Sequence, residues 1–216
     1  MIYLYTGTPG SGKSLNVARL IHNRLRYASN SKGFLKGKNV VANFNIFTDR
    51  IKGKNGKNFN FKYINNLDLN PQKLVEISKE NFVNGQENQC LLVIDECHIL
   101  FNSRDWQKNQ NRMEWVSFFT QHRKLGYEIV LITQFDRSLD RQIRNIVEYQ
   151  VIHRKLNNYK FFRLLPTSTF IAITVWYGLN EKLSVSYFFY KKFYGNFYDS
   201  YSMFEIPEDS QQNLGV

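Results

Sequence analysis

Cysteine is nearly absent from the 216 residues, since only Cys90 and Cys97 occur and both flank the same apolar run. Two thiols placed in this way give neither a metal-ligand pattern nor the disulfide framework of a small secreted domain. The simplest setting for the chain is therefore a reducing cytoplasm.

Long apolar runs are lacking as well. The longest stretch without a charged residue is 164–180, and it contains Pro166, Ser168 and Asn180. It is too short and too polar for a helix that crosses a bilayer, which needs about 20 apolar residues. No targeting segment is expected before the first strand, because a glycine-rich motif already begins at Gly7. We therefore expect a soluble chain.

Acidic residues are few beside basic ones, with 18 Asp and Glu against 29 Lys and Arg and a formal net charge of +11. The imbalance is concentrated in residues 19–62, where eleven basic side chains stand against a single acid, Asp49. Such a block attracts nucleic acid or an anionic membrane surface, and it is equally typical of a solvated loop. The Gly-, Asn- and Lys-rich piece 52–60 favours a flexible loop between strands.

The hydrophobic pattern alternates between strands and helices over most of the chain. The length suits one large domain, and the 43% hydrophobic content is that of a globular protein. Apolar periodicity predicts helices at 15–27, 71–84 and 112–125, the last capped by Gly126, and strands at 1–6, 40–44, 91–94, 129–133 and 147–153. We therefore predict an α/β fold in which helices flank a mostly parallel sheet.

Beyond residue 158 the composition becomes β-branched and aromatic. The runs 161–165, 170–177 and 183–190 are separated by turn residues and predict short strands. We therefore predict a core at residues 1–158, a small β-rich extension of the same domain at 159–201, and a flexible tail at 202–216.

The strongest motif fits the pattern G-x-x-x-x-G-K-[ST] at every position, with Gly7, Thr8, Pro9, Gly10, Ser11, Gly12, Lys13 and Ser14. Glycines let successive backbone N–H groups point inward around phosphates, and the helix that follows presents its positive end to the same anion. Lys13 would supply a charge to the β- and γ-phosphates, and the Ser14 hydroxyl is suited to binding Mg²⁺. Because a strand precedes the motif and a helix follows it, we interpret the run as a nucleotide-binding P-loop rather than a chance turn.

A second motif is the apolar run 91–94, which ends in Asp95 and Glu96. Ligands bind at the carboxyl edge of open α/β sheets, and the two acids would lie at that edge. Asp95 is predicted to hold the magnesium shell, and Glu96 to orient or activate the attacking water. Alone, the pair is a common strand end. About 80 residues after the glycine loop, it is typical of a Walker B element.

Further candidates are an amide and a set of arginines. Gln134 follows the predicted strand 129–133, where it would sense the γ-phosphate or simply belong to a turn. An arginine that reaches into a neighbouring subunit's site would stabilise transition-state charge. The candidates for this role are Arg123, Arg137, Arg141 and Arg144. The sequence does not choose among them, and Arg144 is the working candidate.

The histidines carry less weight than the two motifs. His98 follows the acids, where it would couple nucleotide state to structure or serve a purely structural purpose, and His122 shows no better context. His, Cys and Asp form no cluster with metal-ligand spacing. The only metal expected is therefore nucleotide-bound Mg²⁺.

Several segments together resemble the zonular occludens toxin-like (Zot) domain family. They are 7–14, 92–98, 121–134, 143–148, 190–194 and 198–201. The glycine loop is shared by many NTPases, whereas the His-Arg-x-x-Gly…Thr-Gln segment and the Tyr-Asp-Ser-Tyr end are far more particular. The resemblance spans residues 1 to about 201 and implies a filamentous-phage assembly ATPase, related to additional-strand P-loop DNA motors, that uses ATP and Mg²⁺.

The same resemblance implies partners and a location. Proteins of this family work in the host cytoplasm at the cytoplasmic face of the inner membrane, where they drive assembly and export of phage carrying single-stranded DNA. It therefore implies contacts with single-stranded DNA and with phage coat or assembly proteins, and a homo-oligomeric ring. The usual family layout has a transmembrane helix after the ATPase domain, and no clear one follows here. Membrane association is then expected through a partner or a segment outside this chain.

Three other interpretations remain open. Residues 95–98 spell a helicase box, but superfamily 2 helicases need two tandem motor domains and this chain has one glycine loop. A small-molecule kinase would need an arginine-bearing lid and an acceptor pocket. A nucleotide-gated scaffold would bind phage coat or pore proteins through the aromatic residues of 188–198 and turn over slowly.

Overall fold

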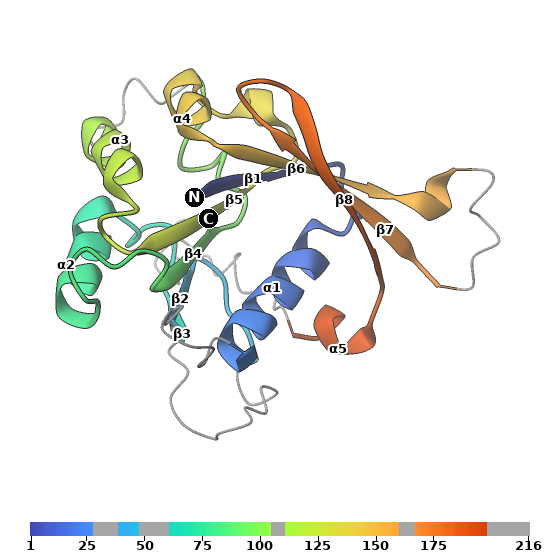
Figure 1. Cartoon of the computed structure of the whole chain (residues 1–216), viewed down its shortest axis with the longest axis horizontal. Helices are drawn as coiled ribbons and strands as arrows, with labels where there is room; N and C mark the ends of the chain where they lie inside the picture. Colours follow the sequence, from blue (N-terminus) through green and yellow to red (C-terminus); the bar gives the residue numbers. More distant parts are fainter. Residues whose placement is uncertain (28–38, 48–60, 105–110, 160–166, 198–216) are drawn as a thin grey trace, which may run out of the picture.

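A single sheet of eight strands organises the chain, which the computed structural model describes at residues 1–27, 39–47, 61–104, 111–159 and 167–197 (Figure 1). Its strands, in sequence order, are β1 (Ile2–Thr6), β2 (Asn39–Ala42), β3 (Phe61–Tyr63), β4 (Cys90–Ile94), β5 (Tyr127–Ile132), β6 (Tyr149–Lys155), β7 (Thr169–Trp176) and β8 (Glu181–Phe189). The helices are α1 (Lys13–Tyr27), α2 (Pro71–Asn81), α3 (Arg112–Gln121), α4 (Arg141–Ile146) and α5 (Lys192–Gly195), with short 3-10 turns η3 (Asp136–Ser138) and η4 (Leu156–Asn158).

The strands lie in the order β3-β2-β4-β5-β1-β6-β7-β8. All neighbouring pairs from β3 to β6 are parallel, whereas β7 and β8 continue the sheet as an antiparallel hairpin. The predicted α/β fold with a mostly parallel sheet and a β-rich C-terminal extension is therefore confirmed. The glycine loop follows β1 and the acidic pair follows β4. One strand, β5, lies between these two strands in the sheet.

Different helices cover the two faces of the sheet (Figure 1). Side chains alternate along each strand. Ile2 and Leu4 of β1 point into a core shared with α2, α3 and α4, whereas Tyr5 packs on the other face with Val17 and Ile21 of α1. The helix α5 joins α1 on that second face. Register extends this division to the hairpin, where the alternate residues on the α1 side include Phe170 and Phe188.

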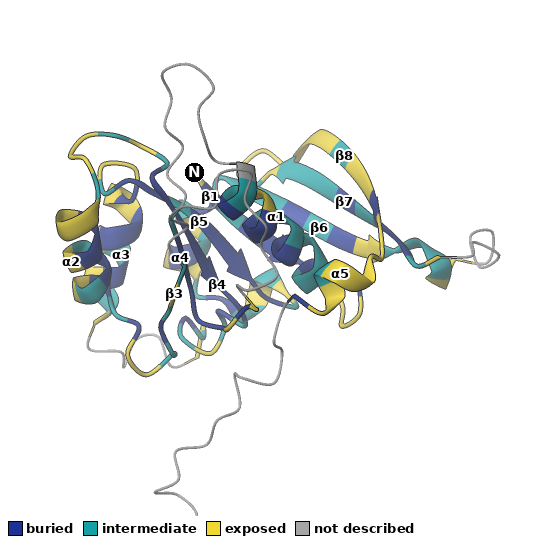
Figure 2. Cartoon of the chain, turned by 90° about the horizontal axis from the view of Figure 1, so that it is seen from below, coloured by how far each residue is buried: buried dark blue, intermediate teal, exposed yellow. Residues whose placement is uncertain are grey.

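Burial distinguishes the parallel part of the sheet from the hairpin (Figure 2). Every residue of β4 is buried, since β2 and β5 flank it and helices cover both of its faces. In β8, by contrast, Phe188 alone is buried.

The predicted helix at 112–125 is too long, because α3 ends at Gln121. The residues that follow turn to begin β5: the Tyr127 N–H donates to the His122 carbonyl, and the Gly126 carbonyl accepts from the N–H groups of Gln89 and Cys90. The Gly126 N–H also donates to the Arg123 carbonyl at 2.9 Å, and with a φ of 79° this glycine closes the turns after α3 in the hydrogen-bond pattern of a helix C-cap, as predicted.

Periodicity also missed β3, α4 and α5, which have three, six and four residues and are too short for a repeating pattern. The predicted strand 161–165, the loop 52–60 and the tail 202–216 lie outside the described residues. Among the helices within the described ranges, none is long and apolar enough to cross a membrane.

Candidate nucleotide-binding site

The glycine loop connects the end of β1 to the start of α1, and its backbone takes conformations that require glycine. Gly7 has a φ of 146° and Gly12 a φ of 94°. A Cβ on Gly7 would lie 2.5 Å from the His153 carbonyl oxygen, and one on Gly12 would lie 2.6 Å from the Phe170 ring. Both residues therefore permit the tight turn and the close approach of β6 and β7 to the loop.

Lys13 folds back over the loop that it ends. Its Nζ donates to the carbonyl of Gly7 at 2.6 Å and to that of Thr8 at 3.3 Å. Burial lowers the pKa of Lys13, whereas the nearby carboxylates of Glu96 and Asp95 raise it. The two motifs therefore lie within electrostatic reach of each other at one edge of the sheet.

Ser11 adds an unsatisfied polar atom to the same loop. Ser11 is 1% exposed. Its Oγ is buried and makes no hydrogen bond with the described part of the chain. A buried hydroxyl without a partner is costly, so its presence in the loop favours a ligand that supplies one.

Asp95 is held at the end of β4 by a buried asparagine. The Asp95 N–H donates to Asn43 Oδ1 at 2.7 Å, and Asn43 Nδ2 donates back to the Asp95 carbonyl at 2.8 Å. Asn43 comes directly after β2 and is 2% exposed. This pair of hydrogen bonds fixes the backbone from which the Asp95 carboxylate projects.

Glu96 adopts a left-handed backbone conformation, with a φ of 44°. Its N–H donates to Asp95 Oδ1 at 2.8 Å, and its Oε2 faces the His98 Nδ1 at 3.1 Å. A non-glycine residue with such a φ carries backbone strain, which functional sites often contain. The side chain is 33% exposed, so it can meet a ligand.

Gln134 lies beside the first glycine of the loop. The Gly7 N–H donates to the Gln134 carbonyl at 3.3 Å, and Gln134 follows β5 in the position between β1 and β4. The structure thus brings Gln134, Lys13 and the two acids to the same edge. This grouping was expected from the strand ends alone.

Arg144 lies in a different part of the fold from Lys13, Asp95 and Glu96. It lies on α4, on the sheet face opposite α1, and its guanidinium adjoins the Tyr177 hydroxyl. Burial and Asp136 raise the pKa of Tyr177, and Arg144 lowers it. A role of Arg144 in a neighbouring copy's site remains a prediction.

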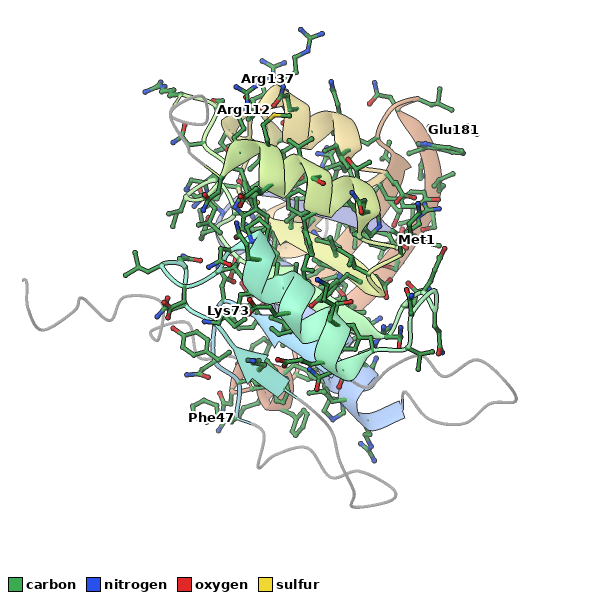
Figure 3. All side chains as sticks on the ribbon, turned by 90° about the vertical axis from the view of Figure 1, so that its left-hand side faces the viewer. Met1, Phe47, Lys73, Arg112, Arg137 and Glu181 are labelled. Carbon is green, nitrogen blue, oxygen red and sulfur yellow. The ribbon has the colours of Figure 1, made fainter. Side chains whose placement is uncertain are left out.

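The other three arginines differ in exposure and pairing. Arg123 pairs with Glu148 at 2.5 Å, and Arg137 and Arg141 are exposed. Figure 3 shows Arg137 at one end of the molecule together with Arg112. Arg137 lies three residues after Gln134, near the same edge as the loop.

His153 is a supporting residue that the sequence analysis missed. Its Nδ1 lies 3.0 Å from the Val151 carbonyl oxygen, and its Nε2 lies 2.9 Å from Asn16 Nδ2. Burial, together with a smaller effect of the Lys13 charge, lowers the pKa of His153 to about 4. A neutral ring that donates from Nδ1 and accepts at Nε2 satisfies both contacts. His153 therefore joins β6 to the first turn of α1 beneath the loop.

Asn43 and His153 share one reason for being missed. Each is a single polar residue at or near the end of a strand, and its partners include groups on other elements or loops of the fold. The only available signal was position: Asn43 lies at the carboxyl end of the predicted strand 40–44, whereas Asp95 and Gln134 directly follow theirs.

Comparison with known proteins decides the family. The model of the family described as zonular occludens toxin (Zot) matches residues 1–202. The chain belongs to the Zot family.

Relatives of this Zot-family chain occur in phages. It is 28% identical over 159 residues to the Gene 1 protein of Enterobacteria phage I2-2, with 72% of this chain and 40% of that protein covered. It is 29% identical over 159 residues to the Gene 1 protein of Salmonella phage IKe, with the same coverage. For Enterobacteria phage M13 the identity is 26%, over 72% of this chain and 42% of the relative. The chain thus spans about two fifths of the length of these relatives.

Two solved structures share the fold of the Zot-family chain. The N-terminal domain of zonular occludens toxin from Neisseria meningitidis has a TM-score of 0.50 at 17% identity, covering 92% of this chain and 98% of that one. The genome packaging NTPase B204 from Sulfolobus turreted icosahedral virus 2, in complex with ATP-gammaS, has a TM-score of 0.52 at 13% identity, covering 86% and 95%. At these identities the likeness shows the fold, which is that of a P-loop NTPase.

Proposed function

We propose that the chain binds ATP with Mg²⁺ and hydrolyses it. The observation that carries this proposal is the grouping of Lys13, Asp95 and Glu96 at one edge of the sheet, where the pKa of Lys13 responds to both carboxylates. The fold shared with B204, whose structure contains ATP-gammaS, supports the same conclusion.

Each residue of the loop has a physical role in this proposal. Backbone N–H groups of residues 10–14 cradle the phosphates, at the amino end of α1. Lys13 leaves the carbonyls of Gly7 and Thr8 to bind the β- and γ-phosphates, and the unpartnered Ser11 Oγ gains a phosphate oxygen.

Ser14 and Asp95 suit Mg²⁺, because a hydroxyl and a carboxylate are the oxygen ligands that this ion prefers. Within the described ranges, no group of three or more His, Cys, Asp or Glu side chains is arranged to hold a metal ion. Two protein oxygens beside a phosphate site therefore fit an ion that arrives with the nucleotide, where it would neutralise phosphate charge. Glu96 orients or activates the attacking water, and Gln134 senses the γ-phosphate.

The wider function we propose is a motor for filamentous-phage assembly and export. Membership of the Zot family and the phage origin of the Gene 1 relatives support it. In this proposal, ATP turnover moves single-stranded DNA or virion components, and the chain works with phage coat or assembly proteins. It acts in the host cytoplasm at the inner membrane, which it reaches through a partner or a segment outside this chain.

We further propose a division of labour within the chain and between copies. Residues 1–158 form the motor core and 159–201 extend it. A homo-oligomeric ring would complete each site with an arginine from the next copy, with Arg144 as the working candidate. Among the other arginines named from the sequence, the exposed Arg137, close to Gln134 in the chain, is the alternative.

The basic block 19–62 contributes less to DNA contact than its charge implies. The Arg24 guanidinium donates to Glu128 Oε2 at 3.0 Å and to the Asn88 carbonyl at 2.6 Å, and its side chain is 8% exposed. Arg19 lies over the Phe188 ring at 5.8 Å. These two arginines therefore serve the fold and are less available to DNA than their charge implies. Seven others lie outside the described residues: Lys32, Lys36, Lys38, Arg50, Lys52, Lys54 and Lys57.

A nucleotide-gated scaffold is the second candidate, and the hairpin favours it. The face of β8 that points away from α1 exposes Tyr187 and Phe189, at 62% and 56%. A contiguous exposed apolar face is typical of a protein-binding surface. A scaffold would use this face for phage proteins and hydrolyse ATP slowly.

ATP hydrolysis by the purified chain, with and without single-stranded DNA, tests the motor against the scaffold. Lys13→Ala should lose ATP binding, and Glu96→Gln should retain binding while turnover falls about 100-fold or more, since a positioned base contributes 10²–10⁴. Glu87→Gln, at an exposed position before β4, is the matched control and should hydrolyse normally.

DNA-stimulated turnover that depends on Lys13 and Glu96 supports the motor. Tight ATP binding without turnover, even at high protein concentration and with DNA, supports the scaffold. If the wild type does not bind ATP, both fail.

A further inference from the structure

An aromatic hollow opens beside the glycine loop, on the side away from the acids. It has a volume of about 310 Å³. One wall is residues 10–15 of the loop and α1, and the other is formed by Phe170, Tyr190, Tyr194 and Gly195. The loop wall is shared with the proposed phosphate site, whereas the aromatic wall comes from the C-terminal part of the chain and has no role assigned above.

Contacts within the fold hold the aromatic wall of the hollow in place. Phe170 is 6% exposed, stacks on Phe188 with ring centroids 5.4 Å apart, and presses against Gly12. The Tyr190 N–H donates to the Ser168 carbonyl at 2.8 Å, which ties the residue after β8 to the start of β7.

Gly195 makes room for the Tyr190 ring, because a Cβ there would lie 2.7 Å from the Tyr190 hydroxyl. The Tyr194 ring packs edge-on against His22 of α1, with ring centroids 5.5 Å apart. Tyr190 is 48% exposed and Tyr194 is half-buried. The two tyrosines are therefore anchored at one end and still accessible to a ligand.

The order of the strands gives the site two chemically different flanks. On one side of β1 lie β5 and β4, which end in Gln134, Asp95 and Glu96. On the other side lie β6, β7 and β8, and the aromatic hollow is lined there by Phe170, near the start of β7, and by Tyr190, just after β8. A nucleoside triphosphate has the same polarity, with charge and a metal ion at one end and a flat, uncharged base at the other.

We infer that the hollow holds the base of the bound nucleotide, stacked against Tyr190 and Tyr194. This rests on the proposed function, because it takes the loop to bind the phosphates. Stacking on aromatic rings tolerates any base, since every base has a π-face. The side chains of the lining that can hydrogen-bond are the hydroxyls of Ser11, Ser14, Tyr190 and Tyr194, which both donate and accept and so suit either purine edge, and Lys13, which is assigned to the phosphates. The site therefore accepts adenine and guanine nearly equally.

Calorimetric titration with Mg²⁺-ATP and with Mg²⁺-tripolyphosphate separates the base from the phosphates. Tyr190→Ala and Tyr194→Ala should each weaken ATP binding about tenfold, as loss of one stacked ring does, and leave tripolyphosphate binding unchanged. Tyr194→Phe keeps the ring and should bind ATP like the wild type. Tyr187→Ala removes an exposed tyrosine from β8 that does not line the hollow, and it should change neither affinity.

The outcomes distinguish this inference from the function on which it rests. If the wild type binds both ligands and the Tyr190 and Tyr194 variants bind ATP as well as it does, the hollow does not hold the base and the loop still binds phosphates. Equal losses for both ligands also overturn the stacking role. If the wild type binds neither ligand, the proposed function fails and the inference fails with it.

Two checks complete the experiment. Thermal unfolding of each variant excludes a folding defect, and the partly exposed Tyr190 carries the test if Tyr194→Ala does not fold. GTP should bind the wild type within about threefold of ATP, because stacking does not read the base edge. A preference above tenfold would show that the edge is read and would overturn the stacking-only account.

Discussion

Strands β4 and β8 are both largely apolar, yet the fold treats them in opposite ways. β4 lies between β2 and β5 with helices on both faces, and each of its five residues is buried. β8 forms the edge of the sheet with one face toward α1, and one of its nine residues is buried. The difference teaches that an apolar run shows that a strand can be buried, whereas the position of the strand in the sheet decides whether it is buried.

The alternation along β8 makes this point sharper. Its apolar residues Tyr187 and Phe189 point away from α1, and Leu183, at a bulge, is also exposed, whereas Ser184 and Ser186 share the α1 side with the buried Phe188. An observer with the sequence alone would place the apolar residues in the core. In the structure most of them form the exposed face instead.

Matched leucine truncations should give the largest difference between the two strands. Leu92→Ala in β4 removes a fully buried side chain and leaves a cavity, so it should lower the free energy of unfolding by about 2–5 kcal/mol. Leu183→Ala in β8 removes a half-exposed side chain and should change it by less than about 0.5 kcal/mol. Urea unfolding followed by circular dichroism measures both.

An equal loss for the two variants would break the comparison. It would mean that Leu183 is buried in solution against another surface. Sedimentation of the wild type at the same concentration would then have to show assembly.

His153 offers a second, smaller effect, because it lies in β6 between the parallel part and the hairpin. Burial holds the pKa of its imidazole at about 4 in the folded chain, below the ordinary value of 6.5. Between pH 4 and pH 6.5 the imidazole is therefore protonated in the unfolded chain and neutral in the folded chain. The stabilising contribution is complete above pH 6.5 and is lost as the pH falls towards 4, at about 1.4 kcal/mol per unit.

Unfolding at pH 7 and pH 5 tests this pH dependence against His153→Gln, which cannot bind the proton. The wild type should lose about 2 kcal/mol more than the variant between the two values. The subtraction removes the contributions of other titrating groups, including His22 and His122, whose pKa values burial also lowers. Parallel losses would show that His153 is protonated in the folded chain, contrary to its neutral role beneath the loop.

The fold class and the outline of the site could be predicted because both rest on local patterns. Lys13, Asp95, Glu96 and Gln134 each follow a run whose periodicity or glycine content is visible in the sequence. Parallel strands end at a common edge, so residues at strand ends come together without any knowledge of strand order. The insertion of β5 between β1 and β4 does not disturb that inference.

The remaining features depend on contacts that join distant parts of the chain. Asn43 binds Asp95 across 52 residues, and His153 binds Asn16 across 137. The aromatic wall reaches the loop only because the hairpin lies next to β6, which no local pattern states. The role of Arg144 is not decided by local pattern either, because a charged residue in a short helix carries no information about which edge or which copy it faces, and it stays a prediction.

The smallest effect concerns backbone strain, and it compares the same feature at β4 and at β8. Glu96, just after β4, has a φ of 44°, and Asn180, just before β8, has a φ of 55°. Asparagine tolerates this conformation through local hydrogen bonding, whereas glutamate does not. Glu96→Gly should therefore raise the free energy of unfolding by about 1 kcal/mol, and Asn180→Gly should change it by only a few tenths.

Glu96→Gly should also lose ATP turnover, because it removes the proposed base. A gain in stability together with a loss of turnover would mean that the strain at the end of β4 is retained for the chemistry there. No gain in stability would mean that the hydrogen bond from the Glu96 N–H to Asp95 Oδ1 already offsets the strain.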